Sequence, residues 1–437
     1  MKAAFHTLGC KVNSYETQAI LEQFRQNGFE IVPFQEKADV YIVNTCSVTA
    51  EAARKSRQML HRCKKVSPDS LVAACGCYAQ EVREELLADP AVDLVAGNNE
   101  KSRLLEMVRV LLEQKERQKE QTPRLLYQDM THCTVYEEQS ITNQGDHVRA
   151  YVKIQDGCDR FCSYCIIPYL RGRSRSRKSE EILQEAGVLA ENGYKEIVLT
   201  GIDLSDYKED DLTLADIVVQ VGQVEGIERV RISSLEERVI SDVFLQKLAS
   251  CPAFCPHFHL SLQSGCDRTL KRMNRHYTAE EYLSAVRLIR QYFPDAAITT
   301  DVIVGFPGES EEDFEDSKRM VMQAAFSELH VFPFSRRKGT KADQMPEQLT
   351  RAKKAERVAS MLEAGERMQR EYLASFLGKE LSVLVEEEIT VDGEKYQAGF
   401  SRNYLKCLIH TNETLINKIV TFIPKETGTI SGEQVLK

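Results

Sequence analysis

The first 120 residues alternate between short apolar runs rich in β-branched residues and longer stretches with one polar and one apolar face. The short runs suit buried strands and the longer stretches suit amphipathic helices. Strands are predicted at Ala3–Leu8, Val40–Val43, Leu71–Ala74 and Val92–Val95. This alternation is typical of parallel strands covered by helices, so residues 1–125 are predicted to form a doubly wound parallel sheet. Asn13 followed by Glu16 predicts the start of the first helix, and Gly28 predicts its end.

A charged stretch, Glu113–Arg124, contains Pro123 and predicts a linker. Beyond it the alternation resumes with six further apolar runs separated by helical patterns. They are Val148–Ile154, Glu196–Thr200, Arg229–Ile232, His257–Leu262, Ala297–Val304 and Leu329–Phe334. A long helical pattern from Thr350 to about Phe376 closes this region. Six successive βα units predict a partial TIM-like (β/α)6 barrel over residues 145–376, with its active site at the carboxyl ends of the strands.

The pattern changes again beyond Gly378, where short β runs follow one another without helices. They are Leu381–Val385, Tyr396–Ala398, Tyr404–Ile409 and Ile416–Ile423, with a turn signal at Asp392-Gly393. About 60 residues of short strands are typical of a small antiparallel β-barrel. Residues 377–437 are therefore predicted to form a third domain, of a kind that often binds oligonucleotides.

Composition adds two constraints. The chain has 57 Lys and Arg against 66 Asp and Glu, a net charge of −9, so any contact with nucleic acid must come from a local basic patch. Its 13 cysteines are odd in number and scattered, which favours metal or redox use in a reducing compartment over a disulfide framework. The N-terminus lacks a secretory pattern and the chain lacks an apolar run long enough to cross a membrane, so a cytoplasmic protein is expected.

Three of the cysteines lie in one short loop, C-x3-C-x2-C, made by Cys158, Cys162 and Cys165. Iron–sulfur clusters are normally held by four thiolates, so a set of three leaves one iron open to a ligand that the protein does not supply. A zinc site is the alternative. It requires four ligands, and no His or Cys follows at short range to complete one.

A second set of three is spread over the first domain, where Cys10, Cys46 and Cys77 each follow a predicted strand. Loops at the carboxyl ends of parallel strands converge on one crevice, so these thiols are expected to meet and hold a second metal centre. Cys is also a common core residue, so burial of any one of them is the simpler alternative. Cys75 lies two residues before Cys77 and is left as a possible ligand in its place.

With Tyr164 before its last Cys, the loop resembles the signature of the radical S-adenosylmethionine (SAM) superfamily. The whole chain resembles the methylthiotransferases of that superfamily, which insert sulfur into an unreactive C–H bond and methylate it. The similar stretches are NTCSVT, GCYAQ, CSYCIIPYLRGRSRSR, HFHLSLQSGCDRTLKRMNR and DVIVGFPGES. The run CIIPYLRGRSRSR is most similar to the branch that acts on N6-threonylcarbamoyladenosine, immediately 3′ of the anticodon in tRNA. In this family the third domain is a TRAM domain that binds RNA.

The resemblance implies roles for the two cysteine sets. Cys158, Cys162 and Cys165 are expected to hold the 4Fe–4S cluster that cleaves SAM. Cys10, Cys46 and Cys77 are expected to hold an auxiliary 4Fe–4S cluster that carries the sulfur, while a further SAM supplies the methyl group. Residues at strand ends are predicted to line the SAM site: Gly201, Ser233, Asp301, Ile303 and Gly305. The implied partners are a tRNA anticodon stem-loop, an electron donor such as flavodoxin or ferredoxin, and a sulfur source.

Arg171, Arg173, Arg175 and Arg177 alternate with Gly and Ser beyond the cysteine loop. Such a run is either a solvated face or a strip that grips phosphates, and its place beside the predicted active site favours RNA contact. His259 is interpreted as a core or surface residue rather than a ligand. Two other hypotheses stay open: the same chemistry on isopentenyladenosine in tRNA or on a ribosomal-protein aspartate, and a non-catalytic RNA-binding protein.

Overall fold

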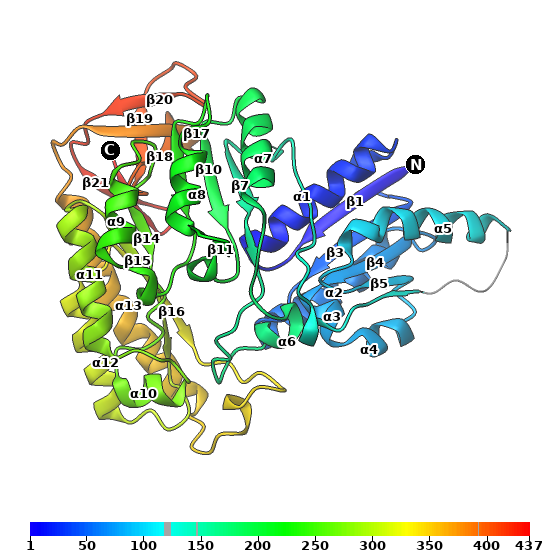
Figure 1. Cartoon of the computed structure of the whole chain (residues 1–437), viewed down its shortest axis with the longest axis horizontal. Helices are drawn as coiled ribbons and strands as arrows, with labels where there is room; N and C mark the ends of the chain where they lie inside the picture. The colour runs from blue at the N-terminus through cyan, green and yellow to red at the C-terminus, as the bar shows by residue number, and fades with distance from the viewer. Residues whose placement is uncertain (118–123, 146, 392) are drawn as a thin grey trace. The chain divides into compact units, whose positions relative to one another are not determined.

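The computed structural model describes residues 1–117, 124–145, 147–391 and 393–437, and the chain divides into two compact units (Figure 1). The first unit contains residues 1–145, 153–178 and 335–343; the second contains residues 146–152, 179–334 and 344–437. All six cysteines of the two predicted sets therefore belong to the first unit. Residues 118–123 of the predicted linker and Asp392 of the predicted turn lie outside the described residues.

A parallel six-stranded sheet forms the centre of the first unit, in the order β2-β1-β3-β4-β5-β6. Its strands are β1 (Lys2–Thr7), β2 (Glu30–Val32), β3 (Val40–Thr45), β4 (Leu71–Gly76), β5 (Leu94–Ala96) and β6 (Leu125–Leu126). The four predicted strands are confirmed; β2 and β6 were missed because two or three residues are too few to show a period. The strand order reverses at β1 and β3, which is where a sheet of this kind opens its ligand crevice.

Helices cover both faces of this sheet (Figure 1). One face packs against α1 (Lys11–Gln26) and α5 (Leu104–Arg117). The other packs against α2 (Ala50–Val66), α3 (Cys77–Glu81) and α4 (Arg83–Ala88).

The predicted start of α1 at Asn13 is wrong, because Cys10 is the N-cap residue. Asn13 is buried inside the helix, and its amide donates to the carbonyls of Leu8 at 2.7 Å and Thr45 at 3.2 Å. It therefore ties the loop after β1 to the end of β3 instead of capping the helix.

The second unit contains the six later strands: β7 (Arg149–Lys153), β10 (Glu196–Thr200), β13 (Arg229–Ile232), β14 (His257–His259), β15 (Ala297–Val304) and β16 (Glu328–Pro333). They form two sheets, β13-β10-β7 and β14-β15-β16, in which β10 pairs parallel with β13, and β15 pairs parallel with β14 and β16. An isolated parallel bridge between Leu235 and Leu260 continues the same direction after β13 and β14.

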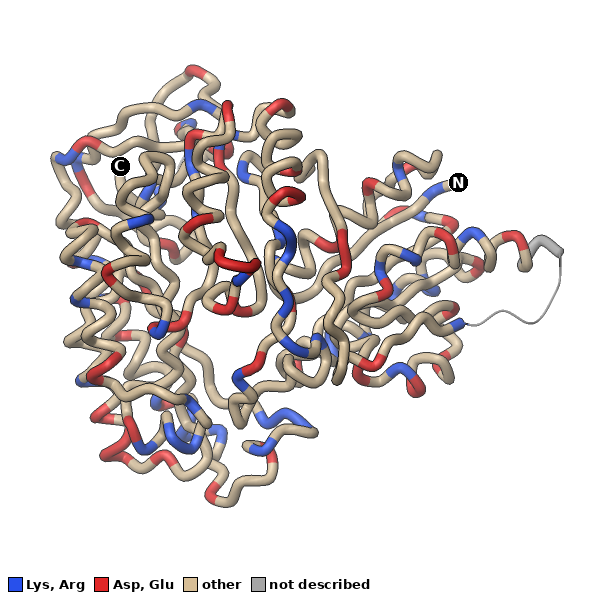
Figure 2. The backbone as a smooth tube through the Cα atoms, in the orientation of Figure 1, with Lys and Arg blue, Asp and Glu red and all other residues tan. Residues whose placement is uncertain are grey.

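Helices separate these strands as predicted. They are α7 (Ser179–Glu191), α8 (Leu214–Val221), α9 (Asp242–Ala249), α10 (Asp267–Arg272), α11 (Ala279–Tyr292) and α12 (Glu311–Ala324), followed by α13 (Arg351–Ala374). Figure 2 shows Lys and Arg interspersed with Asp and Glu along these helices, so the net negative charge is not gathered in one of them. Within the described part of the chain, no helix is long and apolar enough to span a membrane.

The last 60 residues add a mainly antiparallel sheet in the order β20-β17-β18-β19-β22-β21. Its strands are β17 (Leu381–Val391), β18 (Glu394–Ser401), β19 (Lys406–His410), β20 (Ile419–Phe422), β21 (Thr427–Ile430) and β22 (Glu433–Leu436). Val383, Cys407 and Leu436 are fully buried and form its core. The predicted change from βα units to short antiparallel strands is confirmed.

Candidate metal centres

Cys10, Cys46 and Cys77 lie at the carboxyl edge of the first sheet, where they follow the adjacent strands β1, β3 and β4. The loop before Cys10 runs directly against Cys46, because a Cβ on Gly9 would lie 3.0 Å from the Cys46 Sγ. Burial raises the pKa of the Cys46 thiol to about 11, and the nearby thiols of Cys77 and Cys10 act in the same direction. Cys46 and Cys77 are buried, whereas Cys10 is exposed.

Cys75 lies apart from this site, inside strand β4. It is fully buried in the core cluster formed with α1 and α5, and its thiol faces the Val43 carbonyl at 3.7 Å. Burial raises the pKa of this thiol to about 12. Because loss of a thiol proton is required for metal ligation, this environment supports Cys77 over Cys75 as the third ligand.

The side-chain amide of Asn98 contacts the sulfur of Cys77. The Asn98 Nδ2 lies 3.7 Å from the Cys77 Sγ and donates to the Leu170 carbonyl at 3.0 Å. Lys101 donates to the Asn98 Oδ1 at 3.0 Å, which fixes the orientation of the amide, and is itself paired with Glu16 at 2.9 Å. Hydrogen bonds of this kind orient the ligands of a metal centre and tune its electronics.

A buried ionic network lies beneath the site, with Arg171 at its centre. Arg171 is completely buried and contacts Glu16 at 2.9 Å, Asp156 at 3.0 Å and the Asn13 Oδ1 at 2.7 Å. Lys153 pairs with the same two carboxylates at 2.8 and 2.6 Å. Although burial opposes ionisation, Arg171 and Lys153 hold the pKa values of both carboxyl groups below their usual range. Arg171 partly offsets the effect of burial on Cys46, whose thiol pKa nevertheless stays above its ordinary value.

The C-x3-C-x2-C loop is fixed by its backbone. Gly157 requires a glycine, since its φ is +76° and a Cβ there would lie 1.9 Å from the Arg173 carbonyl. The Cys158 amide donates to the Gly172 carbonyl and the Cys165 amide to the Cys162 carbonyl, both at 3.0 Å. The Arg160 amide reaches the Cys158 Sγ at 3.5 Å. These contacts hold the backbone of the loop in a tight turn.

The arginine strip requires a correction, because Arg171, Arg175 and Arg177 are buried. Arg175 donates to the carbonyls of Arg171 and Arg173 at 2.8 and 2.9 Å, and Arg177 to the Tyr15 hydroxyl at 3.3 Å. The negative charge of the buried Glu16 and Asp156 carboxylates favours the burial of these arginine side chains. The Arg173 side chain is 56% exposed and is the one that remains available to RNA.

The five residues predicted to line a SAM site lie in the second unit, at or near strand ends. Gly201 follows β10, Ser233 follows β13, and Asp301, Ile303 and Gly305 lie in or just after β15. The Ser233 Oγ is buried and has no hydrogen-bond partner among the described residues. Such an atom normally requires a partner, so a polar ligand at these strand ends fits it.

Glu237 was missed by the sequence reasoning, since a glutamate in a charged stretch carries no distinguishing signal. It follows β13, and burial raises the pKa of its carboxyl group to about 7, with the neighbouring Glu236 acting in the same direction. A carboxyl group that titrates near neutrality is a candidate for proton transfer or ligand contact.

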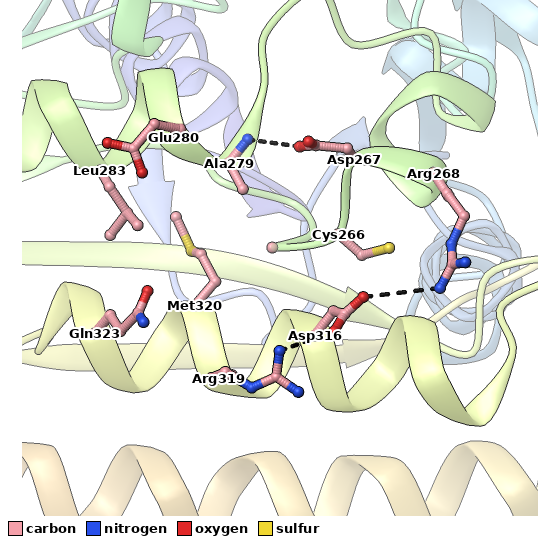
Figure 3. Close-up of a pocket in the computed structure, with 11 residues that line it drawn as sticks. Cys266, Asp267, Arg268, Ala279, Glu280, Leu283, Asp316, Arg319, Met320 and Gln323 are labelled. Atoms are coloured by element: carbon pink, nitrogen blue, oxygen red, sulfur yellow. Dashed lines mark hydrogen bonds and ion pairs between the residues drawn. The ribbon is translucent and has the colours of Figure 1, made fainter.

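A separate hollow of about 360 Å³ is lined by residues of helices α10, α11 and α12 rather than by strand ends (Figure 3). Ion pairs cross its wall, with Asp316 facing Arg268 at 3.7 Å and Arg319 at 3.0 Å. No predicted site residue lines it.

Two family models match the chain: the Radical SAM superfamily over residues 152–321 and the Uncharacterized protein family UPF0004 over residues 2–97. Among solved structures, the radical S-adenosylmethionine methyltransferase TsrM from Kitasatospora setae matches with a TM-score of 0.58 at 13% identity, covering 78% of this chain and 77% of that one. The cobalamin-dependent radical enzyme OxsB matches with a TM-score of 0.52 at 11% identity, covering 84% and 56%. These likenesses show a shared fold, and with the cysteine loop and the superfamily match they define a radical SAM enzyme.

Three curated relatives cover almost the whole chain. Threonylcarbamoyladenosine tRNA methylthiotransferase MtaB of Bacillus subtilis (strain 168) is 39% identical over 95% of this chain and 92% of its own length; that of Aquifex aeolicus (strain VF5) is 40% identical over 91% and 95%. The tRNA-2-methylthio-N(6)-dimethylallyladenosine synthase of Alkaliphilus oremlandii (strain OhILAs) is 34% identical over 98% and 92%. The chain belongs to the methylthiotransferase family of radical SAM enzymes. These enzymes carry two 4Fe–4S clusters and use SAM, in agreement with two sets of three cysteines.

Proposed function

We propose that this enzyme converts N6-threonylcarbamoyladenosine, immediately 3′ of the anticodon in tRNA, to its 2-methylthio derivative. The observation that carries the proposal is the level of identity. Two relatives named for threonylcarbamoyladenosine, from Bacillus subtilis and Aquifex aeolicus, reach 39 and 40% over more than nine-tenths of the chain. The Alkaliphilus relative named for dimethylallyladenosine reaches 34%, and the Thermotoga maritima relative named for threonylcarbamoyladenosine reaches 33%.

The chemistry is divided between the two cysteine sets. Cys158, Cys162 and Cys165 would hold one cluster and Cys10, Cys46 and Cys77 the other. When bound, the clusters and SAM supply a carbon radical, sulfur and a methyl group. The chain's own part is to hold these groups: Arg171 and its partners keep positive charge beneath the second set, and Asn98 donates toward Cys77.

The proposal assigns residues 1–125 to the auxiliary cluster, residues 145–376 to a partial (β/α)6 radical SAM barrel, and residues 377–437 to a small β-barrel of the TRAM type that binds RNA. The parallel pairing of β14, β15 and β16 supports the second assignment, and the antiparallel strands β17–β20 support the third. An electron donor such as flavodoxin or ferredoxin and a sulfur source complete the reaction. A tRNA substrate and the absence of disulfides among the described cysteines support a cytoplasmic site of action.

Mass spectrometry of tRNA nucleosides from a deletion strain tests the substrate. The 2-methylthio derivative of N6-threonylcarbamoyladenosine should disappear and its precursor should accumulate. The wild-type gene should restore the derivative, and a Cys10→Ala copy should not. Loss of the isopentenyladenosine derivative would select the alternative tRNA substrate, and unchanged nucleosides would overturn the proposal.

Arg173→Ala is expected to weaken tRNA binding and to reduce the slope of log affinity against log salt by about 1, the effect of one lost phosphate contact. The side chain is exposed, lies 4.8 Å above the Phe161 ring and pairs with Asp159 at 3.2 Å. Filter binding at several salt concentrations measures the slope. Arg54→Ala is the matched control, since Arg54 is similarly exposed and paired with Glu51 on helix α2. Equal slopes for both variants would contradict a role for Arg173 in RNA binding.

A further inference from the structure

Three side chains capable of binding metal share one face of the sheet formed by β14, β15 and β16. In this sheet His259 pairs with Thr299 and Asp301 pairs directly with His330. Because alternate residues of a strand point to the same side, Thr299 and Asp301 share a face, and His259 and His330 lie beside them. One ligand atom from each of His259, Asp301 and His330 lies within 4.8 Å of the other two.

The opposite face of β15 is closed. Ile298, Thr300 and Val302 are buried, and the Thr300 hydroxyl is bonded to the Leu260 carbonyl at 2.6 Å. His259, Asp301 and His330 lie on the more open face of the sheet, where the side chains of His259 and Asp301 are 16% and 32% exposed. A ligand from solution therefore has access to these atoms.

The contacts made by these three side chains leave their nitrogen and oxygen atoms available to bind a metal ion. The His259 Nδ1 faces the Thr299 hydroxyl at 2.9 Å, which fixes the ring and directs its Nε2 to Asp301 at 3.4 Å. That separation is longer than an ordinary N–H···O hydrogen bond. Within the described part of the chain, no backbone or side-chain group donates a hydrogen bond to the Asp301 carboxylate, and the His330 imidazole makes no hydrogen bond. The two imidazole rings lie 5.9 Å apart.

We propose that His259, Asp301 and His330 bind one divalent first-row metal ion, which assigns Asp301 to a metal instead of the predicted SAM site and makes His259 a ligand. Two imidazoles and a carboxylate form a ligand set with open positions for further ligands. Metal–nitrogen and metal–oxygen bonds of about 2.0–2.2 Å place neighbouring ligands roughly 3 Å apart, so modest side-chain movements close the site. His257 is excluded from the set because it is buried and stacks on Tyr404 at 4.6 Å.

The open positions suit an oxygen ligand of the substrate, an assignment that rests on the proposed function. The threonyl group of N6-threonylcarbamoyladenosine carries a carboxylate and a hydroxyl, both oxygen donors. Phe332 lies two residues beyond His330 on the same face of β16 and is 49% exposed. It provides an aromatic surface on which a purine would stack. The metal would hold the modified side chain of the base, and Phe332 the base itself.

Mn²⁺ titration of the reconstituted holoenzyme, followed by electron paramagnetic resonance of free Mn²⁺, tests the metal site. Iron fills the cysteine sets in this sample, and Mn²⁺ prefers hard oxygen ligands to thiolates. The wild type is expected to bind one Mn²⁺ per chain, with affinity at least tenfold lower in the His330→Ala and Asp301→Asn variants. Iron content and thermal unfolding of each variant report whether it is folded and loaded.

His61→Ala is the matched control, because His61 pairs with Asp89 at 2.8 Å on the first unit without being part of such a trio. Absence of a saturable site in the wild type, or equal affinity in wild type and His330→Ala, would overturn the metal site. Adding N6-threonylcarbamoyladenosine should change the spectrum of bound Mn²⁺; an unchanged spectrum would overturn the substrate contact alone. Neither Mn²⁺ measurement depends on product formation. Failure of the proposed function is tested separately, by the nucleoside analysis of the deletion strain.

Discussion

The variant in which Cys158, Cys162 and Cys165 are all replaced by Ala is expected to contain about four irons per chain after anaerobic reconstitution, against about eight for the wild type. Under the proposed function each set of three cysteines would supply the ligands of one cluster, so removal of one set would leave the other intact. Iron and sulfide analysis gives the counts. The variant should also release no deoxyadenosine from SAM, because the cluster that cleaves it is gone.

The reciprocal variant, with Ala at Cys10, Cys46 and Cys77, should also retain about four irons but should still cleave SAM. Cys75→Ala is the matched control and should retain about eight, since Cys75 is packed in the core of β4. A fall from four irons to none in the first variant would show that the N-terminal cysteines are structural, and sulfur insertion would have to be abandoned.

Arg171→Met is expected to lower the free energy of unfolding by about 3–5 kcal/mol, the usual effect of removing one member of a buried ion pair. Glu16 and Asp156 would keep their burial and lose their principal cationic partner. Urea denaturation at pH 7 measures the change. Arg173→Met is the control: its ion pair with Asp159 is exposed, so an effect below about 1 kcal/mol is expected.

The loss of stability caused by Arg171→Met is predicted to depend on pH. The folded-state pKa values of Glu16 and Asp156 are lowered, so the stability they contribute is present above their ordinary pKa values and is lost as the pH falls toward the folded ones. The difference between wild type and Arg171→Met should therefore shrink below about pH 4. A difference that is small at pH 7, or that grows in acid, would contradict this account of the network.

Much of the fold could be predicted because it depends on local patterns. Strand and helix periods placed the βα units and the final antiparallel strands, and the position of Cys10, Cys46 and Cys77 after adjacent strands predicted their convergence. Spacing alone identified the loop of Cys158, Cys162 and Cys165. These features could be predicted from the sequence because parallel strands bring their carboxyl ends to a common edge.

The sequence by itself thus determined the element types and the family resemblance, and it predicted the two cysteine sets. Only the tertiary structure decided which side chains face inward. It buried Arg171, Arg175 and Arg177 against carboxylates from distant segments, placed Cys75 in the core and brought His330 beside Asp301. Burial and cross-strand register depend on residues far apart in the chain, so a charged or polar residue looks alike in the sequence whether it faces solvent, a partner or a metal.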